Sequence, residues 1–445
     1  MKIEKKNLKV HFIGICGVSM SALAKYLFSV GFIVSGSDLA DGEIAADLKK
    51  NGIRVFIGHD EKNVIGKEVV VYNDAIKPDN VELKAAEKEG AFIVRRAELL
   101  KMVSENFGKR IGIAGCHGKT TACCMIAHVF KRANLRFTAH IGGFDTKLGN
   151  VVLSGSKIFL SEVCEFKKNL TLFDADLAVC LNAEADHLDC YENSGELKKT
   201  YVNYLTRGYK SIICVDDKTL SEYDGDNAVT FGLKNGADFT AKNIREKNGR
   251  YSFDLVVYGV KTERINLRVY GKHNIENALA ASAVAFLCGV GSDKIKKGLE
   301  DFEGVKRRFE KIGEINGAEV IADYAHHPTE IKEAVETAEE MSKGKVYVVF
   351  QPHTYSRTVF LKEQFVSVLG KIQNLIIYKT FPAREEYIEG GSGKDLADLL
   401  GNADYIEDAK EIVRVLQSKA KKKDLVLILG AGDLYFPIKK LLNGL

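Results

Sequence analysis

The sequence predicts an α/β protein of three domains, each built on a mostly parallel sheet. Its 445 residues are too many for a single hydrophobic core, so the chain is expected to divide into domains. Hydrophobic residues make up 46% and charged residues 28% of the chain, a balance typical of globular domains with large cores. Strands of apolar, β-branched residues alternate with helical segments from one end to the other, which indicates parallel sheets covered by helices.

The predicted strands recur along the whole chain. They lie at 9–13, 68–72, 110–114, 158–162, 177–181, 211–215, 345–350, 375–378 and 425–429. Between 239 and 269 the apolar runs are shorter and alternating, with turns at Asn248-Gly249 and Tyr258-Gly259, and this pattern predicts an antiparallel hairpin region. Boundaries near Phe107-Gly108 and Gly313 divide the chain into domains 1–108, 109–313 and 314–445.

Charge and composition narrow the classes of partner. The formal net charge is only +4 and lysines are interleaved with glutamates, so we expect neither a nucleic-acid partner nor a membrane partner. The basic N-terminus followed by apolar residues imitates a signal peptide. Because His11, Gly14 and Gly17 interrupt the apolar stretch, no signal peptide is predicted. The nine cysteines include no C-x-x-C pair, so reduced thiols and a cytoplasmic location are expected.

The strand at 110–114 runs into a glycine turn and then into a helix that begins at Lys119. Gly115 and Gly118 allow a tight turn in which backbone N–H groups and the positive helix end point at one anion. In such loops the lysine reaches the β- and γ-phosphates and the next threonine ligates Mg²⁺, so the predicted ligand is ATP. Only the shorter G-x-x-G-K-T form is present, because Ile113 replaces the first glycine of the full pattern. The predicted ATP-binding residues are Gly115, Cys116, His117, Gly118, Lys119, Thr120 and Thr121.

A second glycine turn follows the first predicted strand. Gly14 and Gly17 stand between that strand and a helix that contains Ser19, and Asp38 follows the next strand. This arrangement predicts a dinucleotide or nucleotide-diphosphate site in which Asp38 accepts a hydrogen bond from a ribose or base. Cys16 and Ser19 occupy two glycine positions of the full fingerprint, which disfavours NAD. Taken alone, the turn could equally be structural.

Carboxylates follow two further strands of the central region. Glu162 ends the strand at 158–162, and the segment 182–189 after the strand at 177–181 offers three carboxylates and His187. Carboxylates at strand ends that face a phosphate loop commonly hold Mg²⁺. Solvated loops are the alternative for each cluster taken separately.

Polar side chains also gather after two strands near the C-terminus, in segments 320–329 and 349–358. Strand ends of this kind bind ligands in α/β domains. Arg357 is suited to the carboxylate of a substrate, because a guanidinium binds it through two parallel hydrogen bonds. The neighbouring His326 and His327 diverge and have no third ligand at a suitable spacing, so zinc is not predicted. The turn at 430–433 is expected to be structural.

Together these segments resemble the Mur ligase family, over nearly the whole chain, and within it the branch that adds L-alanine to UDP-N-acetylmuramate. The segments that carry the resemblance are 11–15, 115–121, 184–187, 271–274 with Asn277, 307–309, 323–329, 351–353, 356–358 and 430–433. The resemblance implies an N-terminal Rossmann-like UDP-sugar domain, a central P-loop ATPase domain and a C-terminal Rossmann-like domain that closes to deliver the amino acid. It also implies a cytoplasmic enzyme of peptidoglycan precursor synthesis, either monomer or homodimer.

The resemblance assigns roles residue by residue. Lys119 would bind the ATP phosphates, Thr120 and Glu162 would hold one Mg²⁺, and His187 would hold a second. Asn274 and Asn277 would contact the adenine. Gly14, Gly17, Ser19 and Asp38 would bind the sugar nucleotide, and Tyr324, His327 and Arg357 would lie around L-alanine and the reacting phosphate. The implied catalytic residues are Lys119, His187, His327 and Arg357.

The implied reaction joins L-alanine to the lactyl carboxylate of UDP-N-acetylmuramate. Because a carboxylate cannot expel oxide, it first takes the γ-phosphoryl group of ATP, and the amine of L-alanine then attacks the acyl phosphate. Two alternatives stay open. One is the recycling ligase that adds a whole tripeptide to the same sugar nucleotide, and the other is a non-catalytic nucleotide-binding relative.

Overall fold

The computed structural model describes residues 7–164, 166–183, 191, 193–234 and 236–444. The chain divides into two compact units. The first unit comprises Met1–Lys242, Asp254–Ile265 and Glu276–Phe302, and the second comprises Asn243–Phe253, Asn266–Ile275 and Glu303–Leu445.

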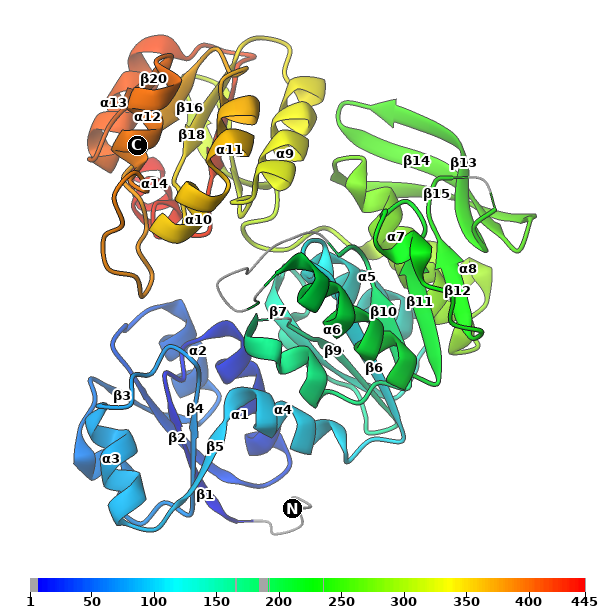
Figure 1. Cartoon of the computed structure of the whole chain (residues 1–445), viewed down its shortest axis with the longest axis vertical. Helices are drawn as coiled ribbons and strands as arrows, with labels where there is room; N and C mark the ends of the chain where they lie inside the picture. The colour runs from blue at the N-terminus through cyan, green and yellow to red at the C-terminus, as the bar shows by residue number, and fades with distance from the viewer. Residues whose placement is uncertain (1–6, 165, 184–190, 192, 235, 445) are drawn as a thin grey trace. The chain divides into compact units, whose positions relative to one another are not determined.

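The N-terminal part of the first unit is a parallel five-stranded sheet in the order β3-β2-β1-β4-β5. Figure 1 shows α1 and α3 on opposite sides of this sheet. The order reverses direction between β1 and β4, and the carboxyl ends of strands at such a point form a ligand crevice. The elements are β1 (Lys9–Ile13), α1 (Val18–Ser29), β2 (Ile33–Asp38), α2 (Glu43–Lys50), β3 (Arg54–Ile57), η1 (Glu61–Val64), β4 (Val69–Tyr72), α3 (Val81–Lys88), β5 (Phe92–Arg95) and α4 (Arg96–Ser104).

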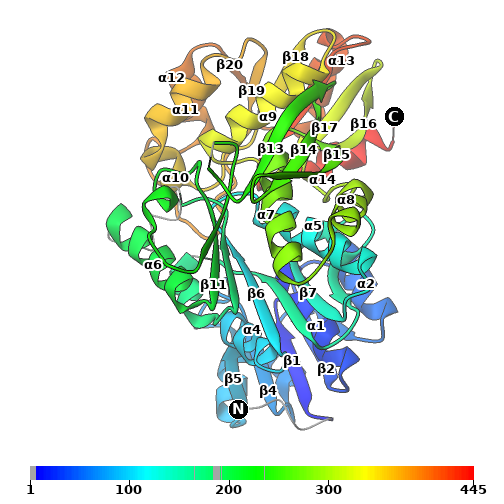
Figure 2. The same cartoon turned by 90° about the vertical axis from the view of Figure 1, so that its right-hand side faces the viewer.

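The central sheet has ten strands in the order β15-β14-β13-β12-β11-β10-β6-β9-β7-β8. Its strands are β6 (Lys109–Ala114), β7 (Phe137–Asp145), β8 (Gly149–Leu153), β9 (Ile158–Glu162), β10 (Leu177–Cys180), β11 (Lys210–Cys214), β12 (Ala228–Phe231), β13 (Phe239–Lys247), β14 (Arg250–Val257) and β15 (Val260–Tyr270). The helices are α5 (Lys119–Arg132), η2 (Phe166–Leu172), α6 (Ser194–Arg207), η4 (Leu220–Glu222), α7 (His273–Leu287) and α8 (Ser292–Asp301). In Figure 2, α5 lies beside α8, and the contact is close because a Cβ at Gly298 would meet the backbone of Val129.

The predicted hairpin region is confirmed. Two-residue turns join β13 to β14 and β14 to β15, and all four turn residues have positive φ, from 48° at Tyr258 to 79° at Gly259. Positive φ at both central residues matches the twist of the two strands that such a turn connects. Asn-Gly is the commonest sequence for this turn. In Tyr-Gly, only the glycine adopts the required positive φ without steric cost.

The C-terminal sheet belongs to the second unit and has the order β16-β17-β21-β18-β19-β20. All its pairs are parallel except β16 with β17. One face packs against α9, α11 and α12, and the other against α13 and α14. The elements are β16 (Glu310–Ile315), β17 (Ala318–Asp323), α9 (Pro328–Met341), β18 (Val346–Phe350), α10 (Tyr355–Phe360), α11 (Lys362–Leu369), β19 (Leu375–Ile377), α12 (Gly393–Leu400), β20 (Ala403–Tyr405), α13 (Ala409–Lys419), β21 (Leu425–Leu429) and α14 (Tyr435–Leu442).

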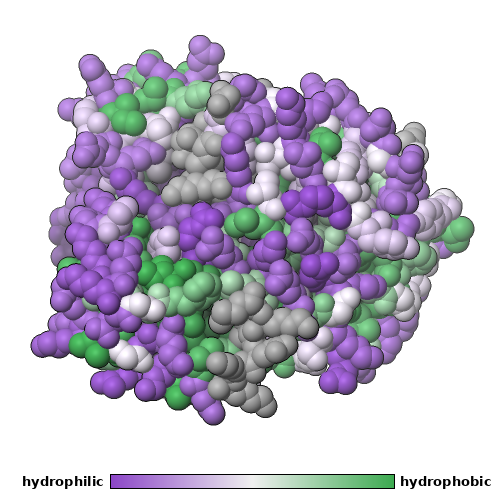
Figure 3. Space-filling view, turned by 60° about the horizontal axis from the view of Figure 1, so that its bottom comes forward, coloured by the Kyte–Doolittle hydropathy of each residue, from purple (hydrophilic) through white to green (hydrophobic). Residues whose placement is uncertain are grey.

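The fold class is therefore as predicted, with three α/β sheets that are mostly parallel. The predicted strands agree with the observed ones to within one residue at each end. The domain boundaries at 108 and 313 stay predictions. Within the described residues, no helix combines the length and apolarity needed to cross a membrane. The face drawn in Figure 3 is mostly hydrophilic, with apolar residues scattered over it.

A buried carboxylate beside the N-terminal sheet accepts several side-chain hydrogen bonds. Glu82 is 0% exposed, and it accepts hydrogen bonds from Ser37 at 2.5 Å, Asn63 at 2.6 Å and His59 at 2.9 Å, while His11 lies 3.8 Å away. Burial alone would raise the pKa of Glu82, but the adjacent His11 and the hydrogen bonds from Ser37, Asn63 and His59 lower it to about 2. The cluster therefore ties Ser37 in β2 to Glu82 in α3.

Replacement of this carboxylate by Glu82→Gln is expected to lower the thermal midpoint at pH 7 and to flatten its acid dependence. The pKa of Glu82 falls from 4.5 to about 2 on folding, so its contribution is complete above pH 4.5 and is lost as the pH falls toward 2. Calorimetry from pH 7 to pH 3 measures both effects. The exposed neighbour Glu61→Gln is the control, and equal acid dependence in the wild type and Glu82→Gln contradicts the prediction.

Candidate active site

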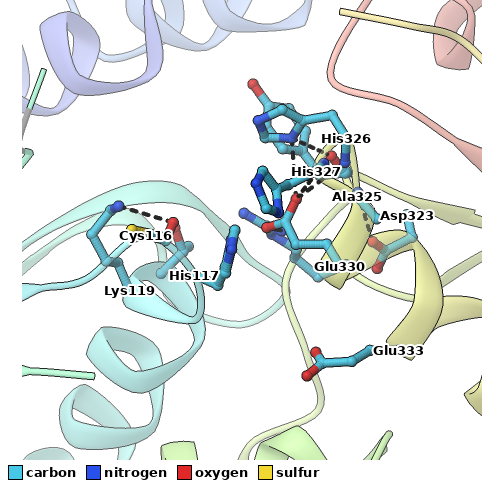
Figure 4. Close-up of polar contacts among 12 residues, drawn as sticks. Cys116, His117, Lys119, Asp323, Ala325, His326, His327, Glu330 and Glu333 are labelled. Atoms are coloured by element: carbon cyan, nitrogen blue, oxygen red, sulfur yellow. Dashed lines mark hydrogen bonds and ion pairs between the residues drawn. The ribbon is translucent and has the colours of Figure 1, made fainter. Parts of the chain in front are cut away.

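The phosphate loop lies between β6 and α5 in the first unit. Gly115 has φ 133° and Gly118 has φ 78°, conformations that side chains other than glycine rarely adopt. Gly118 is the N-cap of α5, so the positive end of a 14-residue helix faces the loop. Lys119 donates from Nζ to the carbonyl oxygens of Gly115 and, at 3.2 Å, of Cys116, and Figure 4 shows it turned toward the loop. The turn thus has the backbone shape predicted for it, with the ammonium group of Lys119 on its carbonyls, and ATP binding there stays a prediction.

Neighbouring elements hold the loop in this shape. Asn182, which follows β10, accepts a hydrogen bond from His117 N at 2.9 Å and donates to His117 O at 3.2 Å. The thiol of Cys116 lies 3.5 Å from the hydroxyl of Tyr201 on α6. The sequence marked Asn182 only as part of a polar strand end, and nothing in the spacing of the residues indicated that it holds His117.

Asn277 on α7 packs against the same loop. A Cβ at Gly118 would meet its Oδ1 atom, and the Asn277 side chain is buried. Asn277 therefore lies against the loop at Gly118, and its predicted contact with adenine stays a prediction. For Asn274, the other predicted adenine contact, the amide donates to Tyr270 O at 2.6 Å.

Gly118→Ala is expected to weaken ATP binding by more than tenfold, because the new methyl group would both strain the positive φ and strike Asn277. Gly149→Ala is the matched control. Gly149 has φ 73°, and a Cβ there meets nothing within 4 Å, so this variant has the conformational strain without the clash. Titration calorimetry with an ATP analogue compares the two, and equal affinities would show that the clash does not matter.

A carboxylate and a hydroxyl meet beside the phosphate loop. Thr120 Oγ1 donates to Glu162 Oε2 at 2.9 Å, and Gly142 N donates to Glu162 Oε1 at 2.5 Å. The two side chains come from α5 and from the end of β9, which pairs directly with β6. Hydroxyl and carboxylate oxygens are the ligands that Mg²⁺ prefers, so this pair fits the predicted metal site. The third predicted ligand, His187, lies outside the described residues, as does the acidic stretch 184–189.

The N-terminal turn follows the carboxyl end of β1, which lies between β2 and β4 in the sheet. Gly14 N and Ile15 N donate to Ser37 O at 2.8 and 3.0 Å, and Gly17 is the N-cap of α1. Asp38 Oδ2 accepts from Cys16 N at 2.9 Å. Asp38 therefore shapes the turn, and its predicted bond to a ribose or base stays a prediction.

The same turn carries the thiol of Cys16, which is half-buried. Burial, followed by the charge of Asp38, raises the pKa of Cys16 to about 12.

Asn73 at the end of β4 lies against the turn, because a Cβ at Gly14 would meet its Nδ2 atom at 3.1 Å. An amide at this position borders the predicted sugar-nucleotide site and can donate or accept hydrogen bonds.

In the second unit, β17 ends in a cluster of charged and aromatic groups. Asp323 is half-buried and accepts from Phe309 N and Ala325 N, both at 2.8 Å, and the removal of its carboxylate from water raises its pKa. The Tyr324 ring has the guanidinium carbons of Arg307 and Arg308 at 4.8 and 5.0 Å from its centroid. Tyr324 therefore lies within cation–π distance of two guanidinium groups.

A row of rings joins Tyr324 to Arg357. The Tyr324 and His326 rings are 5.5 Å apart, and the His326 and His353 rings are 5.6 Å apart. Arg357 donates from a terminal nitrogen to His353 Nδ1 at 3.1 Å. The structure thus brings two predicted substrate residues together through His326 and His353, which the sequence placed in the ligand-binding strand ends without a role of their own.

His327 lies differently from its neighbours. It is 3% exposed, it is the N-cap of α9, and its Nδ1 accepts from Thr329 N at 3.4 Å. Glu330 accepts from the amides of His326 and His327 at 3.1 and 3.4 Å, as Figure 4 shows. His327 holds the strand-to-helix turn, and its predicted role at the substrate stays a prediction.

The turn at 430–433 is tied to the same strand ends. Arg307 donates to the carbonyls of Gly430 and Gly432 at 2.9 and 2.8 Å. Gln351 at the end of β18 bonds Asp433 Oδ1 at 2.8 Å and Leu434 N at 2.9 Å. These contacts agree with the structural role expected for this turn.

Models of protein families and curated sequences match this chain over nearly its whole length. Family models described as the Mur ligase family catalytic domain, the Mur ligase middle domain and the Mur ligase glutamate ligase domain match residues 9–107, 113–285 and 307–432. A UDP-N-acetylmuramate–L-alanine ligase of Clostridium beijerinckii is 37% identical over 99% of both chains. One of Aquifex aeolicus is 38% identical over 97% of this chain and 96% of its own.

Solved structures of related ligases have a similar fold. The crystal structure of the UDP-N-acetylmuramate-alanine ligase of Thermotoga maritima is similar with a TM-score of 0.85 at 27% identity, over 98% of this chain and 99% of that one. A murein peptide ligase from Psychrobacter arcticus shares the fold, with a TM-score of 0.76 at 20% identity, over 99% of both chains. The chain belongs to the Mur ligase family.

Proposed function

We propose that this protein is an ATP-dependent ligase that joins L-alanine to the lactyl carboxylate of UDP-N-acetylmuramate, the first peptide-adding step of peptidoglycan precursor synthesis. The observation that carries the proposal is the phosphate loop with Lys119 inside it and the Thr120–Glu162 pair beside it. Full-length relatives with this activity in their names support the substrate assignment.

The residues of the first unit suit phosphoryl transfer. Lys119 and the amides of the loop would hold the β- and γ-phosphates and offset the charge that develops on them. Thr120 and Glu162 would hold Mg²⁺, which supplies further positive charge to the phosphates when it is bound. The lactyl carboxylate takes the γ-phosphoryl group and ADP leaves. We propose a second Mg²⁺ at His187 and adenine contacts at Asn274 and Asn277.

The residues of the second unit suit the amino acid. Arg357 would bind the L-alanine carboxylate, and His353 orients its guanidinium through the 3.1 Å hydrogen bond. The amine of L-alanine attacks the acyl phosphate, phosphate leaves, and the amine loses a proton. Tyr324 would border the amino acid, and His327 would hold the turn that carries Tyr324 and His326.

The remaining assignments belong to the same proposal. Gly14, Gly17, Ser19 and Asp38 would bind the sugar nucleotide at the crevice of the N-terminal sheet. We propose a monomer or homodimer that works in the cytoplasm, with no nucleic-acid or membrane partner. The proposed domains are 1–108, 109–313 and 314–445.

Phosphate release separates this proposal from its alternatives. Purified protein is given ATP, Mg²⁺ and UDP-N-acetylmuramate, together with L-alanine, with the tripeptide, or with neither. The proposal predicts sustained phosphate release with L-alanine. Faster release with the tripeptide would identify a recycling ligase instead, and no release under any condition would identify a non-catalytic relative.

A further inference from the structure

Four side chains in the first unit form one continuous line of hydrogen bonds. Arg96, at the start of α4, donates to Ser19 Oγ at 3.2 Å, and Ser19 Oγ lies 2.8 Å from His140 Nε2. His140 Nδ1 lies 3.0 Å from Ser161 Oγ, and Ser161 donates to Glu162 O at 2.8 Å. The line begins at the N-terminal sheet and ends on the backbone of the predicted metal ligand.

Regular structure holds this line in place. The parallel register of β7 and β9 sets His140 opposite Ser161, and Ser19 lies in the first turn of α1. Asn150 on β8 donates to Val18 O at 2.8 Å and to Ser21 Oγ at 2.9 Å. Helix α1 is therefore fastened to the central sheet on both sides of Ser19.

The number of hydrogens on each group determines which group donates in each hydrogen bond of the line. Ser161 uses its only hydroxyl hydrogen on Glu162 O, so it must accept from His140 Nδ1–H. A neutral imidazole then has its acceptor at Nε2, which takes the hydrogen of Ser19. Ser19 in turn accepts from Arg96. Each group donates to the next, from a guanidinium at one end to a backbone carbonyl at the other.

The surroundings of His140 keep it in this neutral form. The side chain is 4% exposed, and burial, followed by the nearby charge of Arg96, lowers the pKa of His140 to about 3. Hydrogen bonds in such a chain polarise one another in a buried environment. A change in the hydrogen bond between Arg96 and Ser19 would therefore alter the strength of the bonds made by Ser161.

The two ends of the line lie at two different proposed ligand sites. Ser19 lies at the turn proposed for the sugar nucleotide, where an anionic diphosphate would attract Arg96. Glu162 holds Thr120 and Gly142 N through its carboxylate, so its backbone position sets the geometry proposed for Mg²⁺ and ATP. A shift of Ser161, which is bonded to Glu162 O, would move that carboxylate.

We propose that His140 is a positioning residue that couples the sugar-nucleotide site to the Mg²⁺–ATP site through Ser19 and Ser161. The inference rests on the proposed function, because it takes UDP-N-acetylmuramate as the ligand of the N-terminal turn. Occupation of either site favours the bonded arrangement of the line, so each ligand tightens the binding of the other by the same factor.

Binding measurements test this coupling without turnover. Titration calorimetry gives the Kd of UDP-N-acetylmuramate with and without saturating Mg²⁺ and a non-hydrolysable ATP analogue, and the ratio is the coupling factor. His140→Leu removes both hydrogen bonds of the ring and is expected to reduce the factor at least fivefold, to near one. His140→Gln retains one donor and one acceptor and is expected to recover part of it.

Two further variants separate coupling from folding. Ser161→Ala removes a single hydroxyl, should fold where His140→Leu does not, and is expected to reduce the factor and to add little when combined with His140→Leu. His128→Gln is the matched control, because His128 is also buried in this unit but pairs with Asp145 at 3.0 Å, outside the line. Its coupling factor should equal that of the wild type.

The outcomes are distinct. A coupling factor near one in the wild type, or an unchanged factor in Ser161→Ala, overturns the inference while the proposed function stands. Failure of the wild type to bind UDP-N-acetylmuramate at all refutes the proposed function and the inference with it. Nitrogen-15 NMR of the wild type at pH 7 should show His140 neutral with its proton on Nδ1, and a proton on Nε2 would contradict the direction of the line.

Discussion

Lys119→Ala is expected to lower kcat by roughly 10³-fold while the affinity for UDP-N-acetylmuramate changes little. The ammonium group lies within the phosphate loop, on the carbonyls of Gly115 and Cys116, where it would meet the charge that develops on the γ-phosphoryl group. The sugar nucleotide is proposed to bind at a different turn, between β1 and α1. Steady-state kinetics measures the first effect, and calorimetry with UDP-N-acetylmuramate measures the second.

The control for this variant lies on the same helix. Lys131 is exposed in the last turn of α5, so Lys131→Ala removes a cation of the same kind at the other end of the helix. Its kcat should match that of the wild type. Comparable activity of Lys119→Ala and Lys131→Ala would refute the assignment of the phosphate loop.

Glu162→Gln is expected to raise the Mg²⁺ concentration for half-maximal rate by roughly 10- to 100-fold. The substitution keeps the size of the side chain and an acceptor for Thr120 or Gly142, but it removes the negative charge that would attract the metal. A magnesium titration of the initial rate at saturating ATP gives the shift directly.

Glu222→Gln is the corresponding control. This glutamate is exposed and pairs with Lys198 on the surface of the same unit, so its loss should leave the magnesium titration unchanged. If the titration of Glu162→Gln overlays that of the wild type, Glu162 does not hold the metal.

The sequence predicted the parts of the site that depend on strand ends and local turns. The phosphate loop follows from glycines between a buried strand and a helix, and Gly115 and Gly118 indeed have positive φ. From its place at a strand end, Glu162 was expected to face the phosphate loop, and the family resemblance implied that it shares one Mg²⁺ with Thr120. The two side chains lie 2.9 Å apart in the structure.

The parts that the sequence could not predict depend on contacts between distant segments. Ser19 and His140 are 121 positions apart, and only the packing of α1 on β7 brings them together. The row of His326 and His353 rings likewise needs β17 and β18 to be placed by β21 between them. Periodicity and spacing carry no information about such pairs, since each side chain alone is typical of an ordinary polar position.

Transfer of oxygen from the substrate to phosphate tests the proposed reaction most directly. UDP-N-acetylmuramate labelled with oxygen-18 in its lactyl carboxylate is incubated with ATP, Mg²⁺ and L-alanine, and the released phosphate is analysed by mass spectrometry. Because the carboxylate oxygen attacks phosphorus and leaves with it, the account predicts one labelled oxygen in each phosphate released along with the L-alanyl product. Unlabelled phosphate, with the label kept entirely in the sugar nucleotide, would contradict it.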